Sequence, residues 1–504
     1  MNCPAAASRP IRLLLNGKPI DAAETPPTLS LLSWLREARG LCGTKEGCAE
    51  GDCGACTVVV GELDPAAPDG VKLASINACI QLLPALDGKA VFTVEGIRPP
   101  SGELHPAQQA MVDCHGSQCG FCTPGFVMSL WAQYTAAQPE RARPSSTALR
   151  SALSGNLCRC TGYRPILEAG ERMFELPAVA FDRAALADSL RALQCDTALE
   201  LRHPDGRFRA PRTLDALLAA RAEAPGATVL AGCTDIGLWV NKQFRPVDDI
   251  LYLGAVDELK RIELRADALR IGAGASLSAA WAALVSHWPP LAEMAERFAS
   301  LPIRNAGTLG GNVANGSPIG DSMPVLIALG ARVELVSVRG RRQLALDAFY
   351  LDYMKTAMTP DEILSAIEVP LPTPGQVLRS YKIAKRFDSD ISAVCAAFAL
   401  QLDGTGAHIE TARIAFGGMA ATPRRAPAAE AALTGRIWKE DTVRAAMAAL
   451  ASDYAPLSDL RASAEYRQKL AHNLLWRFWL ETRPIDPLPT TATQVFALRQ
   501  GEVR

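Results

Sequence analysis

The chain has 504 residues and a formal net charge of −1, with 49% hydrophobic and 21% charged residues. This length is enough for roughly three or four domains. A balanced charge without a block of Lys or Arg argues against nucleic acid or an anionic membrane surface as a partner. We also find no signal-peptide pattern and no apolar run of membrane-spanning length. We therefore expect a cytoplasmic protein that is not a membrane protein.

The cysteines are unevenly distributed along the chain. Eleven of the fourteen precede residue 161. A disulfide framework is not expected in a reducing compartment, so this distribution predicts a compact N-terminal region that carries thiol chemistry. Outside the two four-cysteine sets described next, we expect small buried or surface residues at Cys3, Cys42, Cys114, Cys195, Cys233 and Cys395.

The first cysteine set lies in a region with strand patterns. The segment "IRLLLNGKPI" predicts two strands around an Asn-Gly turn, and "CTVVVGEL" predicts another strand. The set itself has the C-x4-C-x2-C spacing with a later fourth cysteine, which is the ligand order of a plant-type [2Fe–2S] cluster. A zinc site would show two short cysteine knuckles and fits this spacing less well. The predicted ligands are Cys48, Cys53, Cys56 and Cys79.

The second set combines C-x2-C with a later C-x-C, within sequence that predicts helices. Thr123 is expected as an N-cap with Pro124 at N1, Gly155 as a C′ glycine, and Pro165 near another helix start. Two helix pairs with a cysteine pair at one end of each would hold a second [2Fe–2S] cluster. Its predicted ligands are Cys119, Cys122, Cys158 and Cys160.

Two glycine-containing loops mark the α/β region that follows. "ATVLAGCTDIGLWVNKQ" predicts a buried strand, a turn and a helix capped by Thr234 or Asp235, a place where backbone N–H groups can cradle phosphate. "FASLPIRNAGTLGGNVANGSPIGDSMP" concentrates Gly and Asn, so its main chain can lie close to a ligand. Together these loops predict a cofactor that bears phosphate.

These motifs resemble those of one family. "CGFCTPG" and "NLCRCTGY" are similar to the proximal-cluster signature of the molybdenum hydroxylases, which include xanthine dehydrogenase and aldehyde oxidase. "GTKEGCAEGDCGACTV" resembles the distal-cluster signature of the same family. The two later loops are similar to its FAD-binding loops. "FDSDISAVCAAFAL" and "ARIAFGGMAATPRRA" look closest to the xanthine dehydrogenase branch.

The resemblance implies residues for the cofactors. One side of the FAD pyrophosphate and ribityl chain would be lined by Val229, Leu230, Ala231, Gly232, Cys233, Thr234, Asp235 and Ile236. The other side would be lined by Gly307, Thr308, Gly311, Asn312 and Asn315, with Asp321 at the ribityl hydroxyls. Asn315 and Gly320 stand where some relatives have Thr and Ser. The flavin ring would lie near Phe298, Ala299, Ile363, Leu364 and Lys382.

Three roles that the resemblance implies have an alternative interpretation. Gln118 would hydrogen-bond the molybdopterin of a partner module, or is a polar residue at a helix end. Phe298 would lie beside the flavin ring, or is a core aromatic residue. The loop from Asp388 to Asp390 would lie near the nicotinamide entrance, or is an exposed acidic turn.

The implied fold class is α+β and multidomain. We expect a β-grasp plant-type ferredoxin domain over 1–97 and a helical-bundle [2Fe–2S] domain over 98–176, followed by a linker over 177–195. We then expect an FAD domain of the vanillyl-alcohol-oxidase type over 196–373. A C-terminal α+β flavoprotein domain over 378–486 and a tail over 487–504 would complete the chain.

The expected function is electron transfer within a xanthine dehydrogenase of the split bacterial type. This chain would be the iron–sulfur/flavin small subunit, and a large subunit would hold the molybdenum centre in an (αβ)2 heterotetramer. Electrons from the oxidation of hypoxanthine and xanthine to urate would pass through both clusters to FAD and then NAD. The alternatives are the corresponding subunit of an aldehyde or aromatic-substrate enzyme, and a self-contained NADH-linked flavin/iron–sulfur reductase.

Overall fold

The computed structural model describes residues 9–99, 101–138, 140, 142–387 and 389–493. The chain divides into two compact units. Unit 1 comprises Met1–Arg261, Gly274–Ala279 and Ala299–Gly311, and unit 2 comprises Ile262–Ala273, Ala280–Phe298 and Asn312–Arg504. The expected FAD domain therefore contributes to both units, and each unit is described by itself. Within the described residues, no helix has the length and apolar character needed to cross a membrane.

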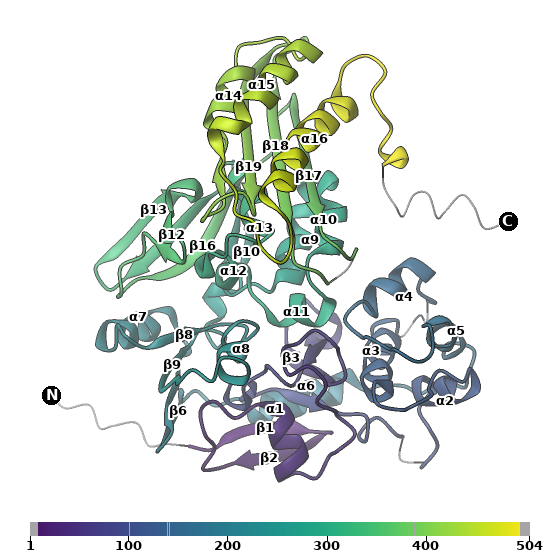
Figure 1. Cartoon of the computed structure of the whole chain (residues 1–504). Helices are drawn as coiled ribbons and strands as arrows, with labels where there is room; N and C mark the ends of the chain where they lie inside the picture. The colour runs from purple at the N-terminus through teal and green to yellow at the C-terminus, as the bar shows by residue number, and fades with distance from the viewer. Residues whose placement is uncertain (1–8, 100, 139, 141, 388, 494–504) are drawn as a thin grey trace. The chain divides into compact units, whose positions relative to one another are not determined.

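Unit 1 begins with a five-stranded mixed sheet of order β2-β1-β5-β3-β4 (Figure 1). β1 and β2 form the predicted hairpin around Asn16 and Gly17, whose φ angles of 51° and 79° suit a two-residue Asn-Gly turn. β1 and β5 run parallel, as in the β-grasp fold that the resemblance implies. The strands are β1 (Ile11–Leu15), β2 (Lys18–Ala22), β3 (Thr57–Leu63), β4 (Val71–Asn77) and β5 (Ala90–Phe92).

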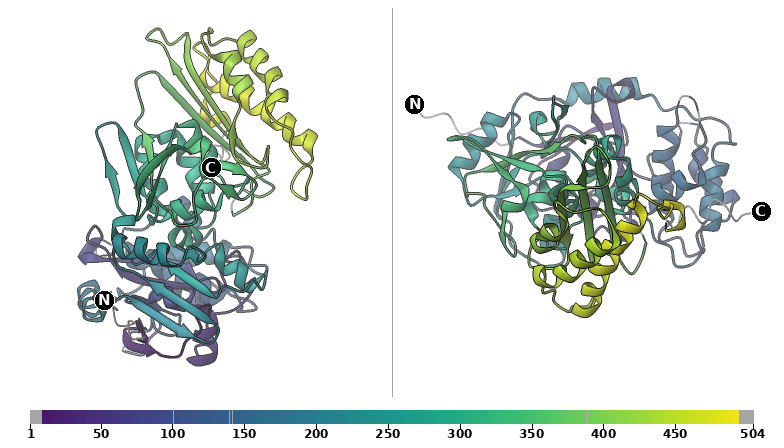
Figure 2. Two further views of the ribbon diagram at one scale, coloured as in Figure 1. Left: turned by 90° about the vertical axis from the view of Figure 1, so that its left-hand side faces the viewer. Right: turned by 90° about the horizontal axis from the view of Figure 1, so that it is seen from above.

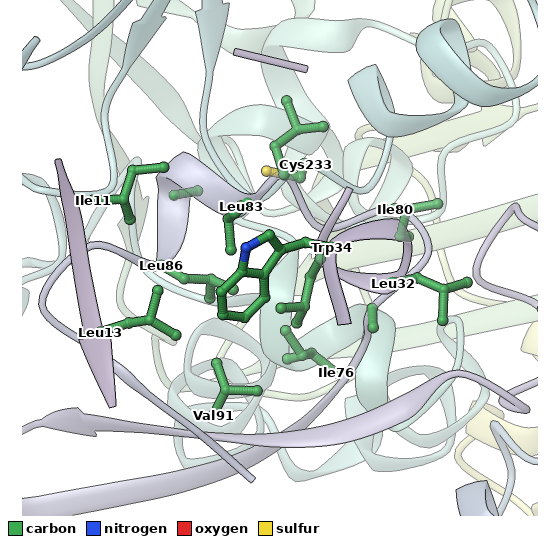
Figure 3. Close-up of a cluster of buried hydrophobic side chains, with 14 of the residues drawn as sticks. Ile11, Leu13, Leu32, Trp34, Ile76, Ile80, Leu83, Leu86, Val91 and Cys233 are labelled. Atoms are coloured by element: carbon green, nitrogen blue, oxygen red, sulfur yellow. The ribbon is translucent and has the colours of Figure 1, made fainter. Parts of the chain in front are cut away.

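A short helical segment covers one face of this sheet. Helix α1 (Leu31–Ser33) starts where the Ser30 hydroxyl accepts a hydrogen bond from Ser33 N at 3.1 Å, and a π-helical turn (Trp34–Ala38) follows it. Figure 3 shows the buried cluster in which Trp34 packs among leucine, isoleucine and valine side chains from the sheet. Burial of each large apolar side chain contributes about 1.5–3 kcal/mol. Cys233 belongs to the same cluster (Figure 3).

Four helices form the next part of unit 1, and a fifth follows them. α2 packs against α5, and α3 packs against α4 and against strand β3 (Figure 1). Pro165 lies in the first turn of α5, as predicted. These helices are α2 (Pro106–Asp113), α3 (Thr123–Ala136), α4 (Ser146–Ala152), α5 (Arg164–Arg172) and α6 (Arg183–Leu193).

A four-stranded sheet of order β6-β7-β9-β8 completes unit 1, with β7 and β8 parallel to β9. Its strands are β6 (Leu199–His203), β7 (Gly206–Ala210), β8 (Thr228–Leu230) and β9 (Asp249–Tyr252). Its helices are α7 (Leu214–Glu223), α8 (Ile236–Asn241) and α11 (Leu301–Ala306), the last of which packs against β4.

Unit 2 contains a five-stranded antiparallel sheet of order β10-β11-β16-β12-β13 and a small hairpin. The strands are β10 (Ile262–Leu264), β11 (Ala268–Gly272), β12 (Arg332–Ser337), β13 (Gly340–Ala345), β14 (Tyr350–Asp352), β15 (Lys355–Thr356) and β16 (Ile363–Pro370). Helices α10 (Ala292–Arg297) and α13 (Ser322–Ala328) belong to this unit. α9 (Leu277–His287) and α12 (Leu309–Asn315) begin in unit 1 and end in unit 2.

A second antiparallel sheet of unit 2 has the order β17-β18-β19-β20 and carries helices α14, α15 and α16 on one face (Figure 2). Its strands are β17 (Gln376–Ile383), β18 (Val394–Leu402), β19 (Ile409–Gly417) and β20 (Arg424–Arg425). Its helices are α14 (Pro427–Leu433), α15 (Glu440–Asp453) and α16 (Ala464–Thr482). The segment "EYRQKLAHNLLWRFWLETR" lies almost entirely in the long helix α16.

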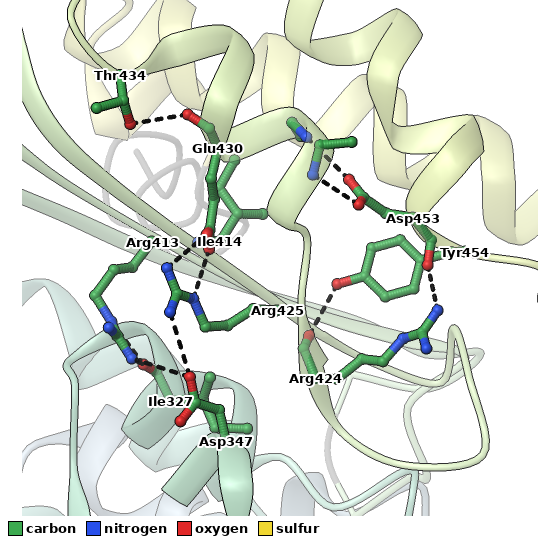
Figure 4. A network of polar contacts seen from close by, with 12 residues as sticks. Ile327, Asp347, Arg413, Ile414, Arg424, Arg425, Glu430, Thr434, Asp453 and Tyr454 are labelled. Atoms are coloured by element: carbon green, nitrogen blue, oxygen red, sulfur yellow. Dashed lines mark hydrogen bonds and ion pairs between the residues drawn. The ribbon is translucent and has the colours of Figure 1, made fainter. Parts of the chain in front are cut away.

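Charged side chains fasten α14 to the edge of this sheet (Figure 4). The Arg425 guanidinium donates to both carboxylate oxygens of Glu430, at 3.0 and 2.6 Å, and also contacts Asp347 at 3.3 Å. Asp453 accepts hydrogen bonds from the backbone N–H groups of Ala428 and Ala429 at the start of α14. Every arginine and carboxylate named here has a partner inside unit 2, so the network is a structural one.

Three local predictions are corrected by the structure. Thr123 is the first residue of α3 rather than its N-cap; Cys122 holds the N-cap position. α4 ends before Leu153, so Gly155 is not its C′ residue. The stretch 177–195 includes helix α6, whose Leu186 and Leu190 are buried in a core with β3 and α3 residues, so much of it is packed structure and not a linker. The predicted tail 487–504 lies partly outside the described residues, as does Asp388.

Candidate functional site

The four cysteines of the first set meet in one chain of thiol contacts, formed by the loop before β3 and the residues that follow β4. The Cys56 and Cys79 sulfur atoms lie 3.3 Å apart, and the Cys48 thiol is hydrogen-bonded to those of Cys53 and Cys79. Three backbone N–H groups, those of Glu50, Asp52 and Cys53, donate to Cys48 Sγ at 3.3–3.4 Å. Such N–H···S bonds stabilise thiolates and the sulfur atoms of a cluster.

The thiol hydrogen bonds separate the pKa values within this set. The hydrogen bond from Cys53 holds the pKa of Cys48 well below its ordinary value, and the bond with Cys79 lowers the pKa of Cys56. The pKa of Cys79 is raised, first of all by its hydrogen bonds with Cys48 and Cys56. The thiolate, which is the form that binds iron, is therefore favoured at Cys48 and Cys56.

The second set lies in the loops at the ends of helices α3 and α5. Cys119 pairs with Cys160, and Cys122 pairs with Cys158. The Thr161 hydroxyl lies 3.2 Å from Cys158 Sγ and lowers the pKa of that thiol against the opposing effect of its burial. Burial raises the pKa of Cys122 to about 12. Cys119 and Cys160 are exposed, so one edge of this set faces outward.

Both sets fit a [2Fe–2S] cluster better than a single metal ion. All cysteines in the described residues are free thiols. In the same residues, no group of three or more Cys, His, Asp or Glu side chains is placed to hold one metal ion. In each set four thiols come together, which is the number that two irons of a [2Fe–2S] cluster need. A Cβ at Gly47 would lie 2.7 Å from Cys53 Sγ, so glycine leaves room for this sulfur.

The predicted phosphate loop of unit 1 turns sharply after β8. Cys233 has a φ of 64°, and α8 begins after Asp235 at its N-cap position, one of the two predicted caps. A Cβ at Gly232 would lie 2.1 Å from Ala306 O and 2.7 Å from Gly307 Cα. The two predicted flavin loops of this unit therefore run in backbone contact, which only glycine permits at position 232.

The side chains of this loop do not all face the same way. The Cys233 thiol is 3% exposed and belongs to the apolar cluster of Figure 3, where burial raises its pKa to about 11. The Cys233 thiol thus belongs to the core and does not face a ligand. Leu230 and Ile236 are buried as well, whereas Thr234 is half-buried and Asp235 is exposed.

The second loop of unit 1 contains the other predicted contacts. Ala299 has a left-handed φ of 49° just before α11. Thr308 Oγ1 accepts a hydrogen bond from Gly311 N at 3.0 Å, which shapes the turn into α12. In the described residues, Ser300 Oγ is buried without a hydrogen-bond partner. A buried hydroxyl of this kind fits a polar ligand.

In unit 2, a buried ion pair joins two predicted flavin contacts. Lys382 Nζ donates to Asp321 Oδ2 at 2.5 Å, and Ser392 Oγ donates to Asp321 Oδ1 at 2.5 Å. Asp321 and Lys382 are only 6% and 4% exposed. The Asp321 carboxylate thus has two protein partners, and a ribityl hydroxyl would be a third. The sequence predicts Asp321 and Lys382 as flavin contacts, but it does not predict their ion pair.

The remaining predicted residues of unit 2 are mostly buried. Phe298 packs on Trp281 with ring centroids 5.6 Å apart, and Ile363 and Leu364 lie in β16 with exposures of 1% and 4%. Asn315 is half-buried at the end of α12. Among the described residues, Asn312 Oδ1 is buried without a partner. This free acceptor fits a ligand that donates from a hydroxyl, as the ribityl chain of FAD would.

Sequence reasoning missed two residues that connect the first cysteine set to the phosphate loop. Asn241, at the end of α8, donates from Nδ2 to the carbonyl oxygens of Cys79 at 2.7 Å and Ala49 at 3.3 Å. Gln81 Nε2 lies 3.4 Å from Cys233 Sγ. Gln81 has no local pattern that predicts this role. For Asn241, the only signal is its place inside the segment "GLWVNKQ", directly after the predicted phosphate loop.

Gln118 lies in the loop between α2 and α3, directly before Cys119, and is exposed. It is not at a helix end, so the alternative interpretation of this residue does not hold. Phe121 and Tyr163, which stand in the two loops that carry the cysteines of this set, are large exposed residues, at 47% and 39%. The exposed edge of the second cysteine set therefore combines polar and apolar side chains.

Family models match most of the chain in an unbroken order. They are a 2Fe-2S iron-sulfur cluster binding domain over residues 13–82 and a [2Fe-2S] binding domain over 93–171. An FAD binding domain in molybdopterin dehydrogenase matches 204–372, and a CO dehydrogenase flavoprotein C-terminal domain matches 379–482. The chain belongs to the molybdenum hydroxylase family and carries its iron–sulfur and flavin domains. The predictions of two [2Fe–2S] domains, an FAD domain and this multidomain α+β fold are confirmed.

The curated relatives give a more particular likeness. The chain is 30% identical over 575 residues to a xanthine dehydrogenase/oxidase of Gallus gallus, covering 96% of this chain and 42% of that protein. It is 34% identical over 470 residues to a xanthine dehydrogenase of Drosophila pseudoobscura pseudoobscura, covering 82% of this chain and 34% of that protein. The chain therefore spans less than half the length of these relatives.

Two solved structures are also similar. A carbon monoxide dehydrogenase from Hydrogenophaga pseudoflava, which lacks the Mo-pyranopterin moiety of its cofactor, matches with a TM-score of 0.52 and 28% identity. The match covers 55% of this chain and 96% of that one. Quinoline 2-oxidoreductase from Pseudomonas putida 86 matches with a TM-score of 0.51 and 25% identity, covering 57% of this chain and 100% of that one.

Proposed function

We propose that this chain is the electron-transfer subunit of a xanthine dehydrogenase. A molybdenum centre on a partner chain would oxidise hypoxanthine and xanthine to urate. This chain would carry the electrons through two [2Fe–2S] sites to FAD and then to NAD, in the cytoplasm. Iron–sulfur clusters transfer single electrons, and a flavin collects two and passes them on as hydride. The proposed site residues are those predicted above.

One observation carries this proposal: within unit 1, the second cysteine set, the first cysteine set and the phosphate loop are joined by hydrogen bonds. The loop before Cys158 bonds to the first cysteine set, because Leu157 N donates to Cys53 O at 3.0 Å. The first set in turn contacts the phosphate loop through Asn241 and Gln81. The first set thus has hydrogen-bonded contacts with both the loop of the second set and the phosphate loop. These contacts support electron flow from an external donor at the exposed cysteines, through the first set, toward the flavin.

The exposed edge supports a partner chain on the donor side. Cys119 and Cys160 are exposed beside Gln118, Phe121 and Tyr163. Interfaces favour such aromatic residues at their centres. We propose that the molybdenum subunit covers this edge, with Gln118 reaching its molybdopterin, in an (αβ)2 heterotetramer.

The choice of substrate rests on the relatives. The xanthine dehydrogenases match 82–96% of this chain in one continuous order. The solved carbon monoxide and quinoline enzymes match only 55–57% of it. The two solved chains are themselves matched over 96–100% of their length, so they are shorter chains, whereas the xanthine dehydrogenases carry the matched domains in one chain, as here. This shared arrangement supports a purine enzyme. A hydroxylase for another substrate is the second candidate, and a substrate panel on the purified complex separates the two.

The test compares two activities of one variant. In the complex with the molybdenum subunit, Cys119→Ser should abolish NAD reduction by xanthine and leave dye reduction by NADH largely intact. Cys114→Ser is the matched control, since Cys114 lies at the end of α2 in the same domain and outside both sets. It should leave both activities unchanged. Equal loss of both activities in Cys119→Ser would contradict the proposed electron path.

A further inference from the structure

The loops that carry the two cysteine sets meet at three glycines of unit 1. A Cβ at Gly54 would lie 2.1 Å from Gly155 O, and a Cβ at Gly125 would lie 2.1 Å from Gly54 O. Gly54 also has a φ of +69°, which disfavours any other residue. The backbone between Cys53 and Cys56 is therefore held directly between helix α3 and the loop before Cys158.

One buried side chain joins these loops. Asn156 is 2% exposed, and its Nδ2 donates to Gly54 O and to Thr57 Oγ1, both at 3.1 Å. Its Oδ1 accepts from Ser129 Oγ at 2.6 Å, a bond that stays within the helical domain. The Thr57 hydroxyl in turn donates to Gly54 O at 2.7 Å. Both amide hydrogens and the amide oxygen of Asn156 therefore have partners, as a buried polar group requires.

The partners of Asn156 lie beside the predicted iron ligands of both sets. Asn156 precedes Cys158 by two residues, and Gly54 and Thr57 flank Cys56 on the other side. The neighbouring bond from Leu157 N to Cys53 O runs between the same loops. Two bonds of one rigid amide thus set the register of one cysteine loop against the other.

We propose that Asn156 is a positioning residue that fixes the separation of the two iron–sulfur sites. This inference rests on the proposed function, because it takes both sets as cluster ligands. A single electron that leaves one cluster reduces the other, and no atom or proton moves with it. The rate of such a step depends steeply on distance. A fixed separation is therefore what the buried amide supplies.

The test uses the full chain with its clusters and measures the magnetic coupling between them. When both clusters are reduced, the dipolar coupling of their electron spins falls with the cube of their separation. It can be measured as a splitting of the electron paramagnetic resonance lines. We expect Asn156→Ala to lose much of this splitting while both cluster signals remain. Thr57→Val removes only one of the two partners and should give a smaller loss.

Ser129→Ala is the matched control. It removes a bond to the same amide, but Ser129 and Asn156 both belong to the helical domain. It should lower the melting temperature to a similar degree and leave the splitting unchanged. If Asn156→Ala does not fold, the splitting in Thr57→Val decides the question alone.

Unchanged splitting in Asn156→Ala would overturn the inference and leave the proposed function intact. If Asn156→Ala does not fold, unchanged splitting in Thr57→Val would have the same meaning. Equal loss of splitting in Ser129→Ala would also overturn it, because the effect would then follow general destabilisation. A wild-type chain without two cluster signals would instead contradict the proposed function itself.

Discussion

The two cysteine sets contain the same number of thiols but differ in burial. Cys56 and Cys79 are 1% and 2% exposed, and Cys48 and Cys53 are half-buried. Cys119 and Cys160 are exposed at the end of a helix pair. The thiols of the second set are therefore the more accessible to a partner chain, which supports an external electron donor on that side.

The largest expected effect separates the two sets completely. Cys53→Ser should remove one of two electron paramagnetic resonance signals, and Cys158→Ser should remove the other. In each variant the iron content should fall from about four to about two per chain, because one [2Fe–2S] cluster is lost. If both substitutions abolish the same signal, the division of ligands into two sets is wrong.

Burial has a different consequence in unit 2, where it encloses a pair of charges. Asp321→Ala leaves the buried Lys382 ammonium without its carboxylate, which should cost about 3–5 kcal/mol of unfolding free energy. Adding Lys382→Met should recover most of this loss. FAD retention should remain weak in both variants if Asp321 also holds the ribityl chain. Full FAD binding in the double variant, measured by fluorescence titration, would remove Asp321 from the flavin site.

Of the two iron–sulfur domains, the helical one should be the more sensitive to acid. Burial lowers the pKa of His105 to about 4, from an ordinary value of 6.5. The unfolded chain therefore binds a proton more readily than the folded one, so stability is complete above pH 6.5 and falls as the pH drops through 6.5 toward 4. The full shift corresponds to about 3 kcal/mol.

Thermal unfolding between pH 7.5 and 4.5 measures this effect through the signal of the helical-domain cluster. His105 Nδ1 accepts a hydrogen bond from Ala107 N at the start of α2, a role that Asn can also fill. His105→Asn should therefore flatten the pH dependence. A profile equal to that of the wild type would assign the acid sensitivity to another group.

The smallest expected effect is kinetic. In the isolated chain, an iron chelator should bleach the helical-domain cluster several-fold faster than the ferredoxin-domain cluster, because only the helical-domain set has exposed thiols. Adding the molybdenum subunit should remove most of this difference by covering the open edge. Equal bleaching rates in the isolated chain would show that burial does not protect the first set.

The parts of the site that the sequence predicted are those encoded by local spacing. The C-x4-C-x2-C and C-x2-C/C-x-C patterns identify the thiols, and the structure brings each set together in pairs. Asn16 and Gly17 predict their hairpin because the turn itself demands positive φ angles. Such features depend on a few neighbouring residues and need no knowledge of the fold.

The parts that were missed depend on residues far apart in the chain. Gly155 has the pattern of a helix C-cap, yet its lack of a side chain serves close packing against Ser300 and Pro302. Asn156 and Gly54 are 102 residues apart, and Lys382 and Asp321 are 61 apart. No local pattern predicts such pairs. Helix α6 lies where the sequence predicts a linker, because its buried leucines have their partners on strands and helices earlier in the chain.

An anaerobic titration of the chain with NADH tests the central claim most directly. The account predicts that the flavin absorbance bleaches and that both iron–sulfur signals appear in electron paramagnetic resonance, because the flavin and both clusters share one chain of contacts. Cys53→Ser should then block reduction of the helical-domain cluster while the flavin still bleaches. Reduction of that cluster at the wild-type rate in Cys53→Ser would contradict the serial path through the ferredoxin domain.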